Sequence, residues 1–337
     1  MTVLVTGGAG YIGAHVVRLL QDRGDAVLVV DDLSSGVAEH VGDATLVQLD
    51  LSREESLGAL ESLLREHSVE AVIHIAAKKQ VGESAERPTW YYQQNVGGFA
   101  NLLQAMQNAQ VHRLMFSSSA ATYGSPDLPP GQPMTEDTPP LPINPYGRTK
   151  LICEWMMTDA GRAWGLRGVG LRYFNVAGAG WPDLGDPGVT NLFPLVLRAL
   201  AEGKQPVVFG DDYPTPDGTC IRDYIHVLDL ADVHLLALDY LAGDDRPHEI
   251  FNVGTGTGTS VKEVLNQLAA STGYDVQPLV MGRRVGDPAA LVADVSRIWE
   301  TLGWRASRSV ADMADSAWQS WEPVHGAPAV PPSRPKV

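Results

Sequence analysis

Tyr146 and Lys150 stand four residues apart, directly behind Pro145, a residue that suits the first turn of a helix. If a helix runs from Tyr146 to about residue 160, both side chains leave from the same face. At ~4 Å and an effective dielectric constant of about 20, an ammonium group stabilises a phenolate by roughly 4 kcal/mol, or about three pKa units. The tyrosine pKa would then fall from near 10 toward about 7, where its phenolate can act as a general base. Tyr and Lys also occur four residues apart by chance on solvated helix faces, so other parts of the chain must show whether this pair is catalytic.

The first thirteen residues contain a loop of the kind that binds a dinucleotide. A short apolar strand, Val3 to Thr6, leads into Gly7, Gly10 and Gly13 and then into a helical pattern through Leu20. The spacing G-x-x-G-x-x-G differs from the commoner G-x-G-x-x-G. Like that motif, it predicts a tight turn, close approach of the backbone to a pyrophosphate, and tight packing of helix on strand.

An acidic residue at the end of the next strand indicates which dinucleotide is bound. Residues 26–30 form a second apolar run, which ends at Asp31 about 20 residues beyond the loop. A carboxylate there can accept hydrogen bonds from an adenosine ribose, and its charge repels a 2′-phosphate. We therefore expect NAD rather than NADP, although an ordinary aspartate at a strand end is the simpler alternative.

The alternation of strands and helices continues and predicts the fold class. We expect strands at 45–49, 71–75, 113–116 and 168–173, and helices at 54–66 and 95–108. Such alternation predicts an α/β protein, a Rossmann-type doubly wound parallel sheet whose ligands bind beyond the carboxyl ends of the strands. Asp50, Ala76 and Ser119 all follow predicted strands and are expected at that edge. The proline-rich loop from Tyr123 to Pro145 is expected to cover part of the site.

From about residue 180 glycine and proline become frequent and the predicted strands become scattered. We expect residues 1–180 to form the NAD-binding domain, with a return segment near 225–255. Residues 181–322 are expected to form mainly a smaller mixed α/β lobe that binds the substrate. The proline-rich residues 323–337 have few apolar anchors and are predicted to be a mobile tail.

Composition narrows the functional classes. The 337 residues carry a formal net charge of −15, which argues against binding nucleic acid or an anionic membrane. The two cysteines, Cys153 and Cys220, lack the spacing of a zinc site or a disulfide scaffold, so no metal is expected. No apolar stretch is long enough to span a bilayer, and the chain begins with a strand pattern rather than a signal peptide. These features predict a reduced, cytoplasmic protein.

Several short motifs follow one another along the chain. They are TGGAGYIG (6–13), VGES (81–84), FSSS (116–119), PYGRTK (145–150), LRYFN (171–175), FGDDYPT (209–215), DGT (217–219) and RDYIHV (222–227). With these motifs the chain resembles the extended short-chain dehydrogenase/reductases and, within them, the UDP-glucose (UDP-galactose) 4-epimerase family. The glycine loop and Tyr-x-x-x-Lys occur across that superfamily, whereas the stretch 217–227 is much more specific. The resemblance extends to about Arg308.

The resemblance implies a reaction and a role for each matching residue. NAD would stay bound while a UDP-sugar is oxidised at C4. The 4-keto sugar would then rotate about its diphosphate link and be reduced on its other face. Tyr146 would be the base, Ser119 would hydrogen-bond the O4 oxygen and relay the proton, and Lys150 would lower the tyrosine pKa and hold the nicotinamide ribose. Cofactor contacts are implied for Gly7, Gly10, Tyr11, Ile12, Gly13, Asp31, Asp50, Leu51, Ala76, Lys79, Asn95, Tyr146, Lys150 and Phe174. Substrate contacts are implied for Ser119, Asn175, Asn191, Leu192, Phe209, Arg222, Arg284, Asp287 and Leu291.

Some alternatives remain open at this level. Related dehydratases carry an Asp-Glu pair after the Ser/Thr, and Ala120 and Ala121, which cannot transfer protons, disfavour dehydration. Leu291 replaces a tyrosine that crowds the sugar C2 position in galactose-type relatives, so UDP-N-acetylglucosamine is one alternative substrate, unless leucine fills enough space to keep the glucose/galactose specificity. UDP-glucuronate is another alternative, which would need an extra cation at the sugar end. Arg222 could instead form a surface ion pair with Asp223.

Two further points concern assembly and turnover. The helix that carries Tyr146 forms a dimer bundle in the family, so a homodimer is expected, with Met156 and Met157 facing either a partner or the core. A protein that senses NAD without turnover is less favoured, because such regulators often lose the Tyr-x-x-x-Lys pair, which is intact in this chain.

Overall fold

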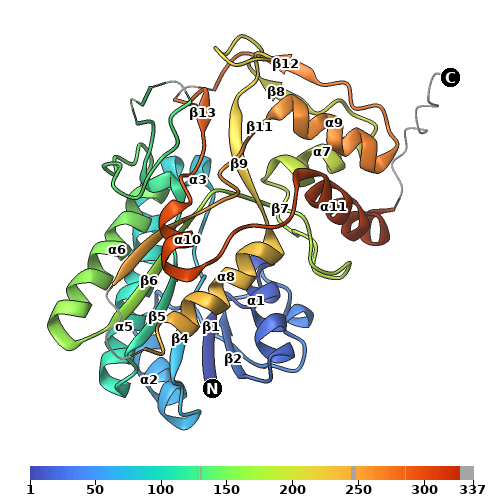
Figure 1. Ribbon diagram of the computed structural model, residues 1–337. Helices are drawn as coiled ribbons and strands as arrows, with labels where there is room; N and C mark the ends of the chain where they lie inside the picture. Colours follow the sequence, from blue (N-terminus) through green and yellow to red (C-terminus); the bar gives the residue numbers. More distant parts are fainter. Residues whose placement is uncertain (127, 130, 244–247, 285, 327–337) are drawn as a thin grey trace.

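The computed structural model describes residues 1–126, 128–129, 131–243, 248–284 and 286–326. Seven parallel strands form its central sheet (Figure 1). In spatial order they are β10 (Glu249–Val253), β6 (Arg167–Tyr173), β5 (Arg113–Ser117), β4 (Ala71–His74), β1 (Thr2–Thr6), β2 (Ala26–Asp31) and β3 (Thr45–Gln48). The strand order reverses between β1 and β4, and this switch point is where an open α/β sheet binds its ligand. The predicted Rossmann-type fold is confirmed.

Helices cover both faces of this sheet. One face packs against α1 (Tyr11–Asp22) and α8 (Val227–Tyr240), and the other against α2 (Ser56–Glu66), α5 (Gly98–Ala109) and α6 (Pro145–Trp164). Side chains alternate along each strand, so Val3 and Val5 enter the first core and Leu4 the second. A strand buried on both faces reads as a continuous apolar run, which is why these strands are recognisable in the sequence.

One predicted helix differs from the structure. The segment expected as a helix from 95 to 108 is α5 together with a π-helical stretch, Tyr92–Gly97, and two short helices precede it, α3 (Val81–Glu86) and α4 (Pro88–Tyr91). Pro88 is the first residue of α4, and Arg87 before it has a non-helical backbone. A proline lacks the N–H that would continue α3, so it starts a new helix instead.

A second group of elements lies beyond the carboxyl edge of the sheet (Figure 1). Its strands are β7 (Asn175–Ala177), β9 (Ile221–His226), β11 (Gly258–Ser260) and β13 (Ala290–Leu291), and separately the pair β8 (Val207–Phe209) and β12 (Leu279–Met281). Its main helices are α7 (Leu192–Ala201), α9 (Val261–Thr272) and α11 (Val310–His325), which share one core. The remaining short helices are Ala38–Val41, Ala120–Thr122 and α10 (Ser296–Leu302). Helix α9 begins with a capping box formed by Ser260 and Glu263.

The boundaries between these parts follow the chain only loosely. After β9 the chain returns to the central sheet through α8 and β10, which pack against α1 and pair with β6. The assignment of residues 1–180 and 181–322 to separate domains remains a prediction. The predicted tail 323–337 overlaps the end of α11, and its residues from 327 onward lie outside the described residues. Within the described ranges, no helix combines the length and apolar character needed to cross a membrane.

Candidate active site

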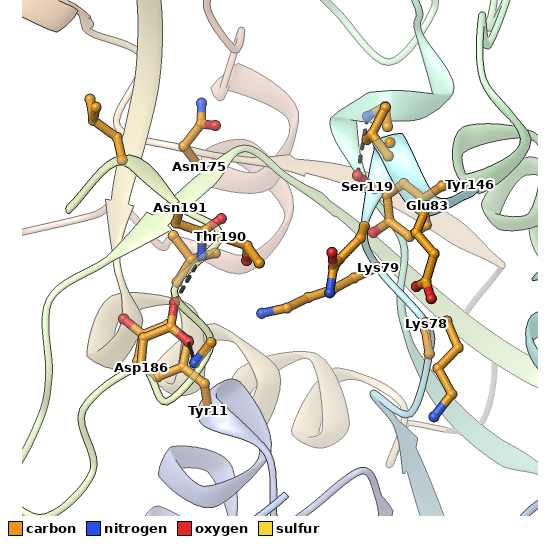
Figure 2. A pocket seen from close by; sticks show the side chains of 18 of the residues that line it. Tyr11, Lys78, Lys79, Glu83, Ser119, Tyr146, Asn175, Asp186, Thr190 and Asn191 are labelled. Carbon is orange, nitrogen blue, oxygen red and sulfur yellow. Dashed lines mark hydrogen bonds between the residues drawn. The ribbon is translucent and has the colours of Figure 1, made fainter. Parts of the chain in front are cut away.

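A large cavity of about 1640 Å³ lies between the carboxyl edge of the central sheet and the second group of elements. Figure 2 shows side chains from both parts converging on it, including Ser119 and Tyr146 on one side and Asn175, Asn191 and Asp186 on the other. The covering loop contributes Gly124, Ile143 and Asn144. The structure places all of the residues implied by the resemblance on the lining of this one cavity: Gly7, Gly10, Tyr11, Ile12, Gly13, Asp31, Asp50, Leu51, Ala76, Lys79, Asn95, Ser119, Tyr146, Lys150, Phe174, Asn175, Asn191, Leu192, Phe209, Arg222, Arg284, Asp287 and Leu291.

The glycine loop fits the pyrophosphate of a dinucleotide. A Cβ at Gly13 would lie 2.0 Å from the Gly7 carbonyl oxygen, so only glycine permits this packing of loop and helix. Gly7 also has a positive φ of 74°. Helix α1 begins after Gly10 with no side-chain cap, which leaves its first N–H groups available to an anion. The residues present therefore fit the cofactor that the sequence predicts.

Asp31 lies at one end of the cavity, where an adenosine ribose would be bound. Its carboxylate accepts hydrogen bonds from the Ala9 and Leu33 backbone N–H groups, at 3.0 and 2.9 Å. Burial raises the pKa of Asp31, while these two hydrogen bonds act in the opposite direction. Each carboxylate oxygen still has capacity for a further donor, such as a ribose hydroxyl.

Asn95 supports the loop at the end of β4 rather than pointing freely into the cavity. Its side chain accepts from the Lys78 N–H at 2.8 Å and donates to the Lys78 carbonyl at 3.0 Å and to Thr149 Oγ1 at 3.0 Å. Because the amide is fully engaged, Asn95 acts on the cofactor site by fixing the backbone that follows β4.

Tyr146 is positioned by the start of helix α6. The Asn144 side chain accepts a hydrogen bond from the Gly147 N–H at 2.8 Å, and Pro145 occupies the first turn. This N-cap and proline pattern fixes where the helix begins. Tyr146 is 8% exposed, and Ser119, whose Oγ accepts from the Ala121 N–H at 3.1 Å, lowers the Tyr146 pKa against the larger effect of burial. Both side chains line the same cavity.

The predicted lowering of the Tyr146 pKa by Lys150 remains a prediction, because the chain alone shows a different balance. Burial raises the pKa of Tyr146, against a smaller lowering by Ser119, so in the chain alone the phenol is not brought toward neutrality. The Lys150 ammonium donates instead to the Ser117 carbonyl at 2.7 Å. Burial also lowers the pKa of Lys150 to about 8. Helical spacing set the two side chains on one face, but desolvation of the phenol outweighs the attraction that the spacing suggested.

A buried ion pair lies directly behind the catalytic segment. Glu154 accepts hydrogen bonds from Arg172 Nε at 2.9 Å and Nη2 at 2.6 Å, and from Ser118 Oγ at 2.5 Å. Glu154 follows Lys150 by one helical turn and is 4% exposed. Glu154 thus connects helix α6 both to Arg172 in β6 and to Ser118, the residue between Ser117 and Ser119.

The other end of the cavity carries arginine side chains. Arg222 forms an ion pair with Asp287, and the Arg284 guanidinium lies 3.9 Å from the centre of the Phe209 ring. The alternative pair of Arg222 with Asp223 is wrong, because Asp223 is fully buried and accepts from the backbone N–H groups of Thr255, Gly256 and Ala293.

Two asparagines at this end are held by neighbours. Asn175 donates to the Asp223 carbonyl at 3.0 Å, and Asn191 donates to the Asp186 carboxylate at 2.9 Å. Lys79 reaches toward them across the cavity in Figure 2. Arginine and lysine at this end suit a diphosphate, even though the protein as a whole is acidic.

Sequence reasoning did not single out Asn144, Asp186, Glu154 or Arg172. Asn144 had a usable signal, since an N-cap residue before a proline is a helix-start pattern. The other three had none, because their partners are distant in sequence. His74 is a buried core histidine whose Nδ1 lies 2.7 Å from Thr6 Oγ1. Over the described ranges, no cluster of three or more His, Cys, Asp or Glu side chains is arranged to hold a metal ion.

Comparisons with known proteins give the same assignment. Residues 3–254 match the model of the NAD dependent epimerase/dehydratase family. The chain is 43% identical over 336 residues to a UDP-glucose 4-epimerase from Halalkalibacterium halodurans, covering 96% of each chain. Among solved structures, it matches the UDP-glucose 4-epimerase from Brucella ovis in complex with NAD with a TM-score of 0.89 and 43% identity, covering 96% of this chain and 98% of that one. It matches the UDP-Glc/GlcNAc 4-epimerase from Campylobacter jejuni with a TM-score of 0.82 and 38% identity, covering 94% and 98%. The chain belongs to the NAD dependent epimerase/dehydratase family.

Proposed function

We propose that this protein is an NAD-dependent 4-epimerase of a UDP-hexose, with UDP-glucose and UDP-galactose as its substrate pair. The observation that carries the proposal is the single cavity, in which a dinucleotide-binding glycine loop, a Ser-Tyr-Lys set and an arginine-lined end face one another. When bound, NAD accepts a hydride from the sugar carbon and later returns it. The chain's own residues must bind both nucleotides, move one proton and allow the sugar to present either face.

Tyr146 is proposed as the base that takes the proton from the sugar O4 hydroxyl. Ser119 is proposed to share that proton, because it lines the same cavity and lowers the Tyr146 pKa. Burial of Tyr146 opposes ionisation, so the positive charges of Lys150 and of the oxidised nicotinamide must together stabilise the phenolate. This division of labour means that Tyr146 is a strong base only while the oxidised cofactor is present.

A Tyr146→Phe substitution tests this role. The variant should retain NAD and the folded state but lose about a thousandfold or more of kcat, within the range expected for a general base with its proton relay. Measured NAD content and far-UV circular dichroism act as the controls. A variant that turns over at a near-normal rate would remove Tyr146 as the base.

For the substrate, we propose that Arg222 and Arg284 lie near the phosphates and that Asn175 and Asn191 orient the nucleotide and sugar, while Lys79 stays a proposed cofactor contact. The ion pair of Arg222 with Asp287 keeps the guanidinium in place before substrate arrives. Leu291 lies in β13, packs among Ala120, Tyr123 and Phe174, and lines the cavity. A leucine is smaller than a tyrosine, so a UDP-sugar with an N-acetyl group at C2 is the second candidate substrate. The likeness to a UDP-Glc/GlcNAc 4-epimerase supports testing it.

The decisive experiment supplies the purified protein with UDP-galactose, UDP-N-acetylgalactosamine and UDP-galacturonate in separate reactions and analyses each product by NMR. We expect inversion at C4 of UDP-galactose. Inversion of the N-acetyl sugar as well would assign the wider specificity, and inversion of the uronic sugar alone would replace the proposed substrate. If no epimer formed from any of the three, the proposed function would be refuted.

We also propose that the protein acts as a homodimer in the cytoplasm. Trp155 on the outer face of α6 is 58% exposed, which supports an interface there, whereas Met157 is fully buried in the core. Light scattering coupled to size-exclusion chromatography tests the dimer, and Trp155→Glu should shift it to a monomer. The proposed location rests on Cys153 and Cys220, which are both free thiols.

A further inference from the structure

Lys78 makes an ion pair that joins two loops on opposite sides of strand β1. Its Nζ lies 2.7 Å from Asp32 Oδ2 and donates to Ser34 Oγ at 2.5 Å. Asp32 and Ser34 follow β2, whereas Lys78 follows β4, and these two strands flank β1 in the sheet. The pair therefore spans the carboxyl end of β1, where the glycine loop begins.

This span closes one end of the cavity. The ends of β2, β3 and β4 supply its walls there, through residues 31–32, 34–35, 49–52 and 75–79. Two of the three walls are joined by the Lys78 ion pair. The same end holds Asp31 and Asp50, the residues expected at the adenosine. Trp90 also lines the cavity, and Lys78 lies 5.8 Å from the centre of its ring.

The two neighbouring lysines leave this loop in different directions. Figure 2 shows Lys79 directed across the cavity, toward Asp186 and Asn191, whereas Lys78, which also lines the cavity, extends in another direction. The backbone of Lys78 is held on both sides by Asn95, at 2.8 and 3.0 Å, so the loop itself cannot swing without breaking those bonds. The side chain of Lys78, which has four rotatable bonds, is the part that can open.

We infer that the Asp32–Lys78 ion pair is a clasp that closes over the adenosine end of bound NAD and slows its exchange. The inference rests on the proposed function, in that NAD must occupy this cavity. A dinucleotide whose pyrophosphate lies at the start of α1 and whose ribose reaches Asp31 must pass between the loops that the clasp joins. The clasp must open to admit the cofactor and to release it. Sugar turnover at the other end of the cavity does not require it to open.

The Lys78→Ala and Asp32→Asn variants test this inference through NAD exchange rather than through activity. NAD-loaded protein is diluted into excess alcohol dehydrogenase with ethanol, and released NAD is read as NADH at 340 nm. Protein stripped of NAD is mixed with fresh cofactor, and association is followed by quenching of tryptophan fluorescence. The matched control is Arg65→Ala, which removes an exposed ion pair with Glu61 on α2, away from the cavity.

We expect both clasp variants to release NAD about tenfold faster and to bind it faster as well, with the control unchanged. A tenfold change in rate corresponds to about 1.4 kcal/mol. This is near the upper end of what a partly buried ion pair with a second hydrogen bond contributes. High salt should speed release from the wild type and have little effect on Lys78→Ala. The combined variant, Asp32→Asn with Lys78→Ala, should be no faster than either single variant.

Two results would overturn the clasp. Release within twofold of the wild type would show that the pair does not restrain the cofactor. Faster release with an unchanged association rate would show that Lys78 only touches bound NAD and does not close over it. A wild-type protein that binds no NAD would instead refute the proposed function, and the clasp with it, so the two failures are distinguishable.

Discussion

The buried pair of Glu154 and Arg172 offers a quantitative test of how the catalytic segment is supported. The two side chains are 5% and 6% exposed, and they share two hydrogen bonds, with Ser118 adding a third to Glu154. Arg172 Nη1 is already without a hydrogen-bond partner within the part of the chain that the structure describes. A Glu154→Gln substitution leaves that guanidinium buried without its anion, which costs about 3–5 kcal/mol.

The assay is the shift of the urea unfolding midpoint, followed by tryptophan fluorescence and by circular dichroism so that non-coincident transitions would be seen. The matched control is Glu61→Gln, which breaks the exposed pair with Arg65 and should shift the unfolding midpoint far less. Replacing both partners, by Glu154→Leu with Arg172→Met, should recover most of the loss, because no charge is then left buried.

Catalysis gives a second readout at a temperature where Glu154→Gln is still folded. We expect kcat to fall more than the Michaelis constant rises, because Ser118 adjoins the proposed proton relay and is not among the residues that line the cavity. The reasoning is refuted if Glu154→Gln destabilises the protein no more than Glu61→Gln does.

Three further predictions follow from the site and the core. Gly13→Ala should abolish NAD binding in equilibrium dialysis, because its Cβ would meet the Gly7 carbonyl oxygen at 2.0 Å; retained binding would show that the loop can relax. Leu291→Tyr should suppress any turnover of UDP-N-acetylgalactosamine relative to UDP-galactose, and an unchanged ratio of kcat/KM values would discard Leu291 as a specificity residue. Acid should destabilise the fold between about pH 6.5 and pH 4, measured as the urea midpoint at each pH. Burial lowers the pKa of a set of histidines, so the unfolded chain binds protons in this range that the folded chain does not, at up to about 1.4 kcal/mol per pH unit for each. That set is His15, His226 and His234, with pKa values of about 4, and His74, at about 3. A midpoint that does not change over this range would contradict the neutral burial of these side chains.

Much of the fold was predictable because its determinants are local. Apolar runs of four to six residues become strands of a buried parallel sheet, and the helical patterns between them become the covering layers. The exception was the region from 81 to 97, where short helices and a π-helical stretch replaced a simple loop and helix. These residues both line the cavity and pack against α6. The spacing of apolar residues along the sequence does not show either contact.

The pairing of Arg222 shows why side-chain partners were harder to predict. Asp223 is adjacent in sequence, but neighbouring residues of a strand point to opposite faces. Asp223 therefore turns into the interior and accepts backbone N–H groups, while Arg222 meets Asp287, 65 residues away. Sequence proximity selects the wrong partner whenever both residues lie in one strand.

Sequence alone determined the glycine loop, the acid at the end of β2, the strand ends that meet at one edge, and the helical spacing of Tyr146 and Lys150, since each depends on a few neighbouring residues. Tertiary structure decided how these groups behave. It buried Tyr146 and so raised its pKa, directed Lys150 to the Ser117 carbonyl, and brought Lys78 to Asp32 across β1. Burial and long-range pairing depend on which elements pack together, and that information resides in the assembled fold rather than in any single stretch of the chain.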